Sequence, residues 1–303
     1  RHQVVTMLYL MLLVGMVIGA LGFSLLLEPF SYFRLIQVIQ GSALVVAGLN
    51  IVAMWQMEPR RPDLTSFELS RPSFGQSWRA LSKNPGAHRL LIAVALGTLG
   101  FSMQEILLEP YGAEVLAMSV SQTTRLTAIF AGGMLIAMAL SARYLGRGGE
   151  PIRLAAYGAV VGVFAFAAVI MAGAFDSLTL FAAGTLLIGI GNGLFAVGTL
   201  TAAMLLAGTA TAGLVIGTWG AVQATAVGCA VFLGGALRDM TEALIQGGMI
   251  SQQLSGPATP YGAVYHLEII ILFASLVALG PLVRRLGNNK DQPLTMKLAD
   301  FPS

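Results

Sequence analysis

Eight long apolar segments dominate this sequence and restrict what it can fold into. They cover residues 4–27, 35–57, 90–108, 123–145, 152–175, 178–207, 213–237 and 264–283. A helix that crosses the hydrocarbon core of a bilayer needs about 20 mostly apolar residues. Backbone polar groups find no water in lipid, so each such segment must satisfy them internally as a helix. The sequence therefore predicts an all-α membrane protein with eight transmembrane helices.

The composition agrees with a chain that faces lipid. Charged residues make up 10% of the sequence, hydrophobic residues 56%, and the mean hydropathy is +0.79. A soluble domain carries about 25% charged residues. The single cysteine excludes an internal disulfide, and no GxxxxGK[ST], HExxH or GxSxG motif occurs. The sequence thus predicts a membrane protein that is not an enzyme.

The basic residues set an orientation. With eight spans, 14 of the 17 lysines and arginines fall on one side, in the two ends of the chain, the connector 58–89 and the loop 143–153. The positive-inside rule makes that side cytoplasmic. We therefore expect both ends of this chain to be cytoplasmic. The pI of 9.2 then reflects orientation, and no nucleic-acid partner is expected.

The polar connector divides the spans into a group of two and a group of six. We expect two helices in residues 1–57, a cytoplasmic linker in 58–89, six helices in 90–287 and a flexible cytoplasmic tail in 288–303. The polar segment 239–261 predicts an extracytoplasmic loop. Within it, residues 240–250 fit an amphipathic helix on the membrane surface.

Ionisable residues inside the spans are candidates for a binding site, because a charge in hydrocarbon costs at least about 2.5 kcal/mol. Glu105 lies in the third span beside Gln104, and Glu109 follows four residues later, on the same face of a continuous helix. A carboxylate at Glu105 suits a hydrogen bond, a shared proton or a hard cation such as the magnesium of a chlorin. The alternative is a structural carboxyl paired with a neighbouring helix.

The last two spans hold further candidates. His266 and Glu268 lie near the outer end of the eighth span, where the imidazole suits an axial pigment ligand or an anchor for the helix start. In the seventh span, Gln223 suits an interhelical hydrogen bond, and Trp219 suits stacking on a pigment or ordinary packing. Apart from chlorin magnesium, for which Glu105 and His266 are the candidate ligands, no metal site is predicted.

Two glycine patterns predict close helix contacts or a concavity against a flat ring. They are Gly189-x-Gly191-x-Gly193 and Gly213-xxx-Gly217-xx-Gly220.

Several stretches of the sequence resemble the PucC/LhaA family of phototrophic bacteria. They are FSMQEILLEPYGAEVL (101–116), RLIQVIQG (34–41), GLFAVGTLTAA (193–203), GTWGAVQAT (217–225), GGALRD (234–239) and YHLEI (265–269). The chain departs from the usual family pattern at Glu105, where aspartate is common, and at Ala113, where glycine is common. Glutamate keeps the carboxylate of aspartate and lengthens the side chain by one methylene.

The resemblance implies a fold similar to the major facilitator superfamily, with twelve spans in two six-helix halves. This chain would then hold the last two helices of the first half, the linker and the complete second half, and would lack the first four helices. It also implies a multi-pass protein of the bacterial inner, photosynthetic membrane that assists assembly of light-harvesting complexes.

The same resemblance implies that the protein binds or delivers bacteriochlorophyll, with a carotenoid as the alternative pigment. The implied partners are antenna polypeptides and the reaction-centre–antenna complex, the pigment-synthesis and membrane-insertion machinery, and membrane lipid. The residues expected to bind pigment are Gln104, Glu105, Glu109, Trp219, Gln223, His266 and Glu268.

Two alternatives belong to other functional classes. One is a secondary transporter of a porphyrin-like or amphipathic solute, with Glu105 as the proton-coupling group. The other is a structural subunit of a photosynthetic supercomplex that packs against antenna helices through its glycine-rich faces.

Overall fold

The structure, a computed structural model, describes residues 31–55, 85–206, 212–249 and 256–287, with the single positions 26 and 75. The predicted first span, the tail 288–303 and most of the linker lie outside these residues. The described residues form helices and no strand. The elements are α2 (Tyr32–Met54), α4 (Pro85–Ser102), η2 (Met103–Ile106), α5 (Leu108–Val115), α6 (Val120–Gly146), α7 (Pro151–Ala174), α8 (Leu178–Leu206), α9 (Ala212–Gln246) and α10 (Thr259–Gly287).

Seven of these helices are long and apolar enough to cross a membrane. They coincide with seven of the eight predicted segments. The prediction of an all-α membrane protein is therefore confirmed, while the segment 4–27 stays a prediction.

The chain separates into two units, Arg1–Ser70 and Arg71–Ser303. The described part of the first unit is essentially α2. Its N-cap is Ser31, whose side chain accepts a hydrogen bond from the Arg34 amide at 3.1 Å. Large apolar side chains point outward around this helix; Leu44 is 75% exposed and Val52 is 72% exposed. Such a surface is suited to lipid or to a neighbouring helix. The division into domains expected from the sequence stays a prediction.

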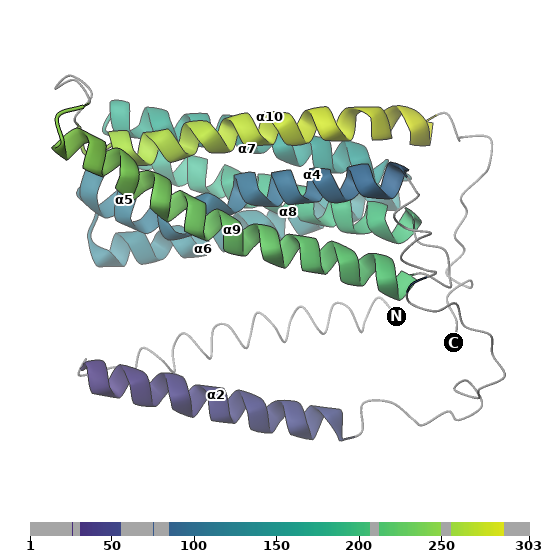
Figure 1. The fold of residues 1–303 in the computed structure, drawn as a ribbon, viewed down its shortest axis with the longest axis horizontal. Coiled ribbons are helices and arrows are strands. Elements are labelled where there is room, and N and C mark those ends of the chain that lie inside the picture. The colour runs from purple at the N-terminus through teal and green to yellow at the C-terminus, as the bar shows by residue number, and fades with distance from the viewer. Residues whose placement is uncertain are drawn as a thin grey trace. The chain divides into compact units, whose positions relative to one another are not determined.

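In the second unit α8 packs against both α6 and α7, while α10 packs against α4, α7 and α9 (Figure 1). A core of aromatic rings joins these layers. Phe101 of α4 lies 6.3 Å from Phe166 of α7 and 5.9 Å from Phe195 of α8, measured between ring centroids. A hydrogen bond from Ser275 Oγ to the Ala93 carbonyl, at 3.1 Å, also links α10 to α4.

Close helix contacts at α8 confirm the first glycine pattern. A β-carbon added at Gly191 would lie 2.8 Å from the Gly158 carbonyl oxygen of α7, and one added at Gly193 would lie 2.6 Å from Ala137 Cβ of α6. Adding one at Gly189 brings it against the backbone of Phe130 in α6. Small residues at these positions let the three helices pack backbone to backbone, as is common in membranes.

The segment after residue 238 differs from the expectation. Instead of a loop with a separate surface helix at 240–250, α9 continues unbroken to Gln246. Two contacts between side chains four residues apart stabilise the extension. They are an ion pair between Arg238 and Glu242 at 3.0 Å and a hydrogen bond from Gln246 to Glu242 at 3.4 Å. The 35 residues of α9 measure about 52 Å, so the helix exceeds a hydrocarbon core of about 30 Å.

Candidate functional site at the break between α4 and α5

The third span is not one helix, and buried polar groups of the second unit meet at its break. α4 ends at Ser102, a short 3-10 turn covers Met103–Ile106, and α5 begins at Leu108. Pro110 explains the break, because proline has no amide hydrogen for the Ile106 carbonyl and its ring collides with that carbonyl in a continuous helix. Glu105 and Glu109 therefore lie on separate elements. The expectation that both lie on one continuous helix is therefore wrong.

Among the described residues of this unit, the buried carboxylate is Glu268 of α10. It is fully buried, and its Oε1 accepts a hydrogen bond of 2.7 Å from the backbone N–H of Gln104, whose side chain is also buried. This amide lies within the 3-10 turn, and the Glu268 carboxyl group is its hydrogen-bond acceptor. Glu105 has an exposed side chain instead. Of these two candidate carboxylates, the structure therefore encloses Glu268 and leaves Glu105 at the surface of η2.

Two oxygens at this place have no hydrogen-bond partner in the described part of the chain, Glu268 Oε2 and the Tyr265 hydroxyl. Both residues are buried on the same side of α10. Tyr265 contacts Tyr111 of α5 edge to face at 5.5 Å between centroids and stacks on Phe166 at 6.2 Å. An unpaired polar oxygen in such apolar surroundings is destabilising unless a proton, a water or a ligand group satisfies it.

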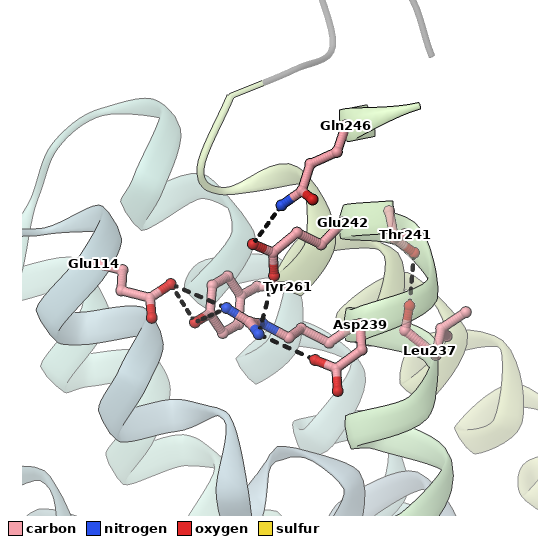
Figure 2. Close-up of polar contacts among 8 residues, drawn as sticks. Glu114, Leu237, Asp239, Thr241, Glu242, Gln246 and Tyr261 are labelled. Carbon is pink, nitrogen blue, oxygen red and sulfur yellow. Dashed lines mark hydrogen bonds and ion pairs between the residues drawn. The ribbon is translucent and has the colours of Figure 1, made fainter. Parts of the chain in front are cut away.

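A second polar cluster fastens α5, α9 and α10 together (Figure 2). Arg238 of α9 lies at its centre, 3.4 Å from Glu114 and 3.0 Å from both Asp239 and Glu242. The Tyr261 hydroxyl donates a 2.6 Å hydrogen bond to Glu114, and the Arg238 guanidinium lies 5.3 Å from the centre of the Tyr261 ring. Side chains from three helices therefore contact the Arg238 guanidinium, and we call this cluster the clamp.

Removing the clamp is expected to have a modest effect. Because Arg238 is 25% and Glu114 51% exposed, their coupling in a double-mutant cycle of Arg238→Ala and Glu114→Gln should be about 1 kcal/mol or less. Denaturant unfolding of the four proteins measures it. A coupling of several kcal/mol would contradict this account of the cluster as a solvent-screened clamp.

The remaining sequence-predicted residues do not meet in one place. Glu109 is exposed and accepts a 2.7 Å hydrogen bond from the Thr127 hydroxyl of α6. Trp219 is half-buried and its indole N–H donates to the Thr199 hydroxyl at 3.3 Å. Gln223 is half-buried on α9, and His266 is exposed on α10. Of the seven predicted residues, the structure brings together Gln104 and Glu268.

An apolar groove of about 890 Å³ runs between α4 and α9. Small residues recur every four positions along its α9 wall. They are Gly213, Gly217, Ala221, Thr225 and Cys229. A β-carbon added at Gly213 or Gly217 meets no atom within 4 Å. The second glycine pattern therefore shapes a concavity here instead of a helix contact.

Sequence reasoning missed Arg238, Tyr261, Tyr265 and Tyr111 as parts of these clusters. The signals were present: Tyr261, Tyr265 and Glu268 recur at helical spacing on one face, and Arg238 is a charge at the end of an apolar segment. These residues lie in or beside the stretches that carry the family resemblance.

The comparison with protein families decides the family. A model of the PUCC protein family matches residues 1–287. The chain belongs to the PUCC family. The resemblance read from the sequence is confirmed over nearly the whole chain.

Individual relatives agree with this membership. The chain is 45% identical over 286 residues to a protein named PucC from Cereibacter sphaeroides. The matched stretch covers 94% of this chain and 61% of that relative. It is 46% identical over 309 residues to an uncharacterized protein in the puhA-bchM intergenic region of Rhodobacter capsulatus, covering 100% and 64%. A Rhodobacter capsulatus protein named bacteriochlorophyll synthase 44.5 kDa chain is 27% identical over 298 residues, covering 94% and 65%.

The PUCC-family chain thus spans about three fifths of the length of the curated relatives it matches. No solved structure matches it. The arrangement similar to the major facilitator superfamily stays a prediction.

Proposed function

We propose that this PUCC-family protein is an assembly factor for bacterial light-harvesting antenna complexes, which binds or delivers bacteriochlorophyll to antenna polypeptides at the inner photosynthetic membrane. Family membership over residues 1–287 is the observation that carries the proposal. The printed name of one distant relative also refers to bacteriochlorophyll. Delivery requires binding and release of the pigment and no bond-making step, so the proposed role is not enzymatic.

The proposed partners are the antenna polypeptides, and through them the reaction-centre–antenna complex and the pigment-synthesis and membrane-insertion machinery. The distribution of the basic residues supports cytoplasmic ends for this chain.

The groove between α4 and α9 supports the part of the proposal in which the protein binds antenna polypeptides. Its small residues from Gly213 to Cys229 extend over about 24 Å at 1.5 Å per residue, which is most of a hydrocarbon core of about 30 Å. Small residues every four positions let a second helix approach closely in a membrane. An apolar, single-span antenna helix fits a groove of this length and lining.

Filling the groove tests this assignment. Gly217→Leu should reduce co-purification of antenna polypeptides and the antenna content of phototrophic cells several-fold, because the side chain occupies the space meant for the partner. Gly228→Leu is the matched control, since Gly228 also lies on α9 with nothing within 4 Å of its added β-carbon but does not line the groove.

The measurement is the near-infrared antenna absorption of a deletion strain that carries each variant. Wild-type antenna levels with Gly217→Leu would refute the groove as the docking place. Wild-type levels in the uncomplemented deletion strain would refute the assembly role itself.

A second candidate is a secondary transporter of a porphyrin-like solute, and the buried Glu268 beside a broken helix favours it. Discontinuous helices with ionisable groups form the coupling sites of many transporters. In this alternative Glu268, which is buried, replaces Glu105 as the candidate proton-coupling group. Uptake into proteoliposomes that follows a pH gradient and is lost in Glu268→Gln would favour transport, and pigment retention without gradient-driven uptake would favour the assembly factor.

A further inference from the structure

The outer face of α10 between residues 266 and 277 is exposed at His266, Ile270, Phe273 and Val277. Ile270 is 62%, Phe273 54% and Val277 77% exposed. The opposite face of the same helix buries Tyr265, Glu268 and Leu272 in the core. Because α10 is long and apolar enough to span a membrane, its outer face is suited to lipid or to an apolar ligand.

His266 is the polar residue on this outer face, and its ring is held in one orientation. Its Nδ1 lies 2.6 Å from the carbonyl oxygen of Gly262, one turn earlier. A carbonyl only accepts hydrogen bonds, so Nδ1 carries the hydrogen in this contact. In the neutral imidazole Nε2 therefore holds a lone pair, and no contact to Nε2 occurs among the described residues.

This arrangement matches that of a metal-binding histidine. A ligating imidazole commonly donates its second nitrogen's hydrogen to a backbone carbonyl, which fixes both the tautomer and the direction of the lone pair. His266 lies seven residues after the helix start at Thr259, about 10 Å along the axis. A nitrogen lone pair without a partner at such a place on a lipid-facing helix is unfavourable, and a metal centre satisfies it.

The surface beside His266 has room for a flat ring. Helical side chains lean over the turn that precedes them, so the imidazole lies over Gly262. A β-carbon added at Gly262 would meet nothing within 4 Å. A macrocycle bound through Nε2 would meet no side chain at Gly262. The exposed apolar side chains of Ile270 and Phe273 would offer it further contacts along the helix.

We propose that Nε2 of His266 is the axial ligand of the magnesium of a chlorin, and that the macrocycle lies along the outer face of α10. The proposal rests on the proposed function, because it names the residue that holds the pigment. The step is ligation: the Nε2 lone pair enters the open axial position of the magnesium, and no proton is transferred. Glu105, the other ligand candidate from the sequence, is exposed on η2 and is not assigned this role.

The test uses the full chain, purified in detergent and mixed with bacteriochlorophyll a or with its metal-free form, bacteriopheophytin a. Pigment per protein is measured after gel filtration, and resonance Raman spectra report the magnesium coordination. His266→Leu should bind bacteriochlorophyll a about tenfold or more weakly, since loss of a second-shell partner alone costs about 10–100-fold in metal affinity. Binding of bacteriopheophytin a should not change.

His88→Leu is the matched control, because His88 is also an exposed histidine on a spanning helix, α4, and should bind like wild type. Wild-type binding and magnesium coordination in His266→Leu would overturn the inference and leave the proposed function in place. Equal loss of both pigments would overturn ligation in favour of surface contact. If the wild type binds no pigment, the inference and the pigment half of the proposed function both fail.

Discussion

Gly189→Leu is expected to prevent folding of the six described spans of the second unit. A β-carbon at this position would meet the backbone carbonyl of Phe130 and would also lie 3.2 Å from the Met134 amide nitrogen. Backbone atoms within a helix cannot yield as a flexible side chain can, so α6 and α8 must separate. The expected destabilisation exceeds about 3 kcal/mol, the upper end for overpacking a tight core.

The measurement is the yield of monodisperse protein by size-exclusion chromatography, followed by its thermal unfolding. Gly217→Leu is the control, because it makes the same chemical change at a position where an added β-carbon meets nothing within 4 Å. We expect the control to retain wild-type yield. Comparable yields of the two variants would contradict the described contact between α6 and α8.

Glu268→Ala is expected to produce the second largest loss of stability. It removes the acceptor of the Gln104 amide, whose N–H then lies buried without a partner at the helix break. An unsatisfied buried donor costs about 1–3 kcal/mol, and the cavity left by the side chain adds to that loss. We therefore expect the free energy of unfolding to fall by about 2–4 kcal/mol.

Glu268→Gln separates the role of the hydrogen-bond acceptor from that of the ionisable group. Glutamine keeps a carbonyl oxygen for the Gln104 amide, so its stability should lie closer to wild type than to alanine. Denaturant titration of the three proteins, followed by the near-ultraviolet signal of the packed aromatic core, gives the order. If alanine and glutamine are equally stable, the 2.7 Å contact does not hold the break in place.

The spans were predictable because about 20 consecutive apolar residues determine their own structure in lipid. The contacts of Gly189, Gly191 and Gly193 followed from a local spacing as well. The end of α9 did not follow, because Asp239 and Glu242 look like loop residues until Arg238 is known to pair along the helix.

The site was less predictable for a physical reason. Which acid is buried depends on how α10 is rotated against the break between α4 and α5, and sequence spacing does not contain that rotation. Glu105 and Glu268 are equally polar in the sequence, yet tertiary packing exposes the first and encloses the second. The role of Pro110 in breaking the helix could have been predicted from the sequence, since proline removes the backbone hydrogen bond to the residue four positions earlier.

The most direct test of the central claim is the absorption spectrum of this protein purified gently from pigmented membranes of phototrophically grown cells. A protein that handles bacteriochlorophyll should retain a near-infrared chlorin band and carry antenna polypeptides with it, and a carotenoid cargo would show as absorption in the visible instead. A preparation with neither chlorin nor antenna polypeptide, from cells that make both, would contradict the account.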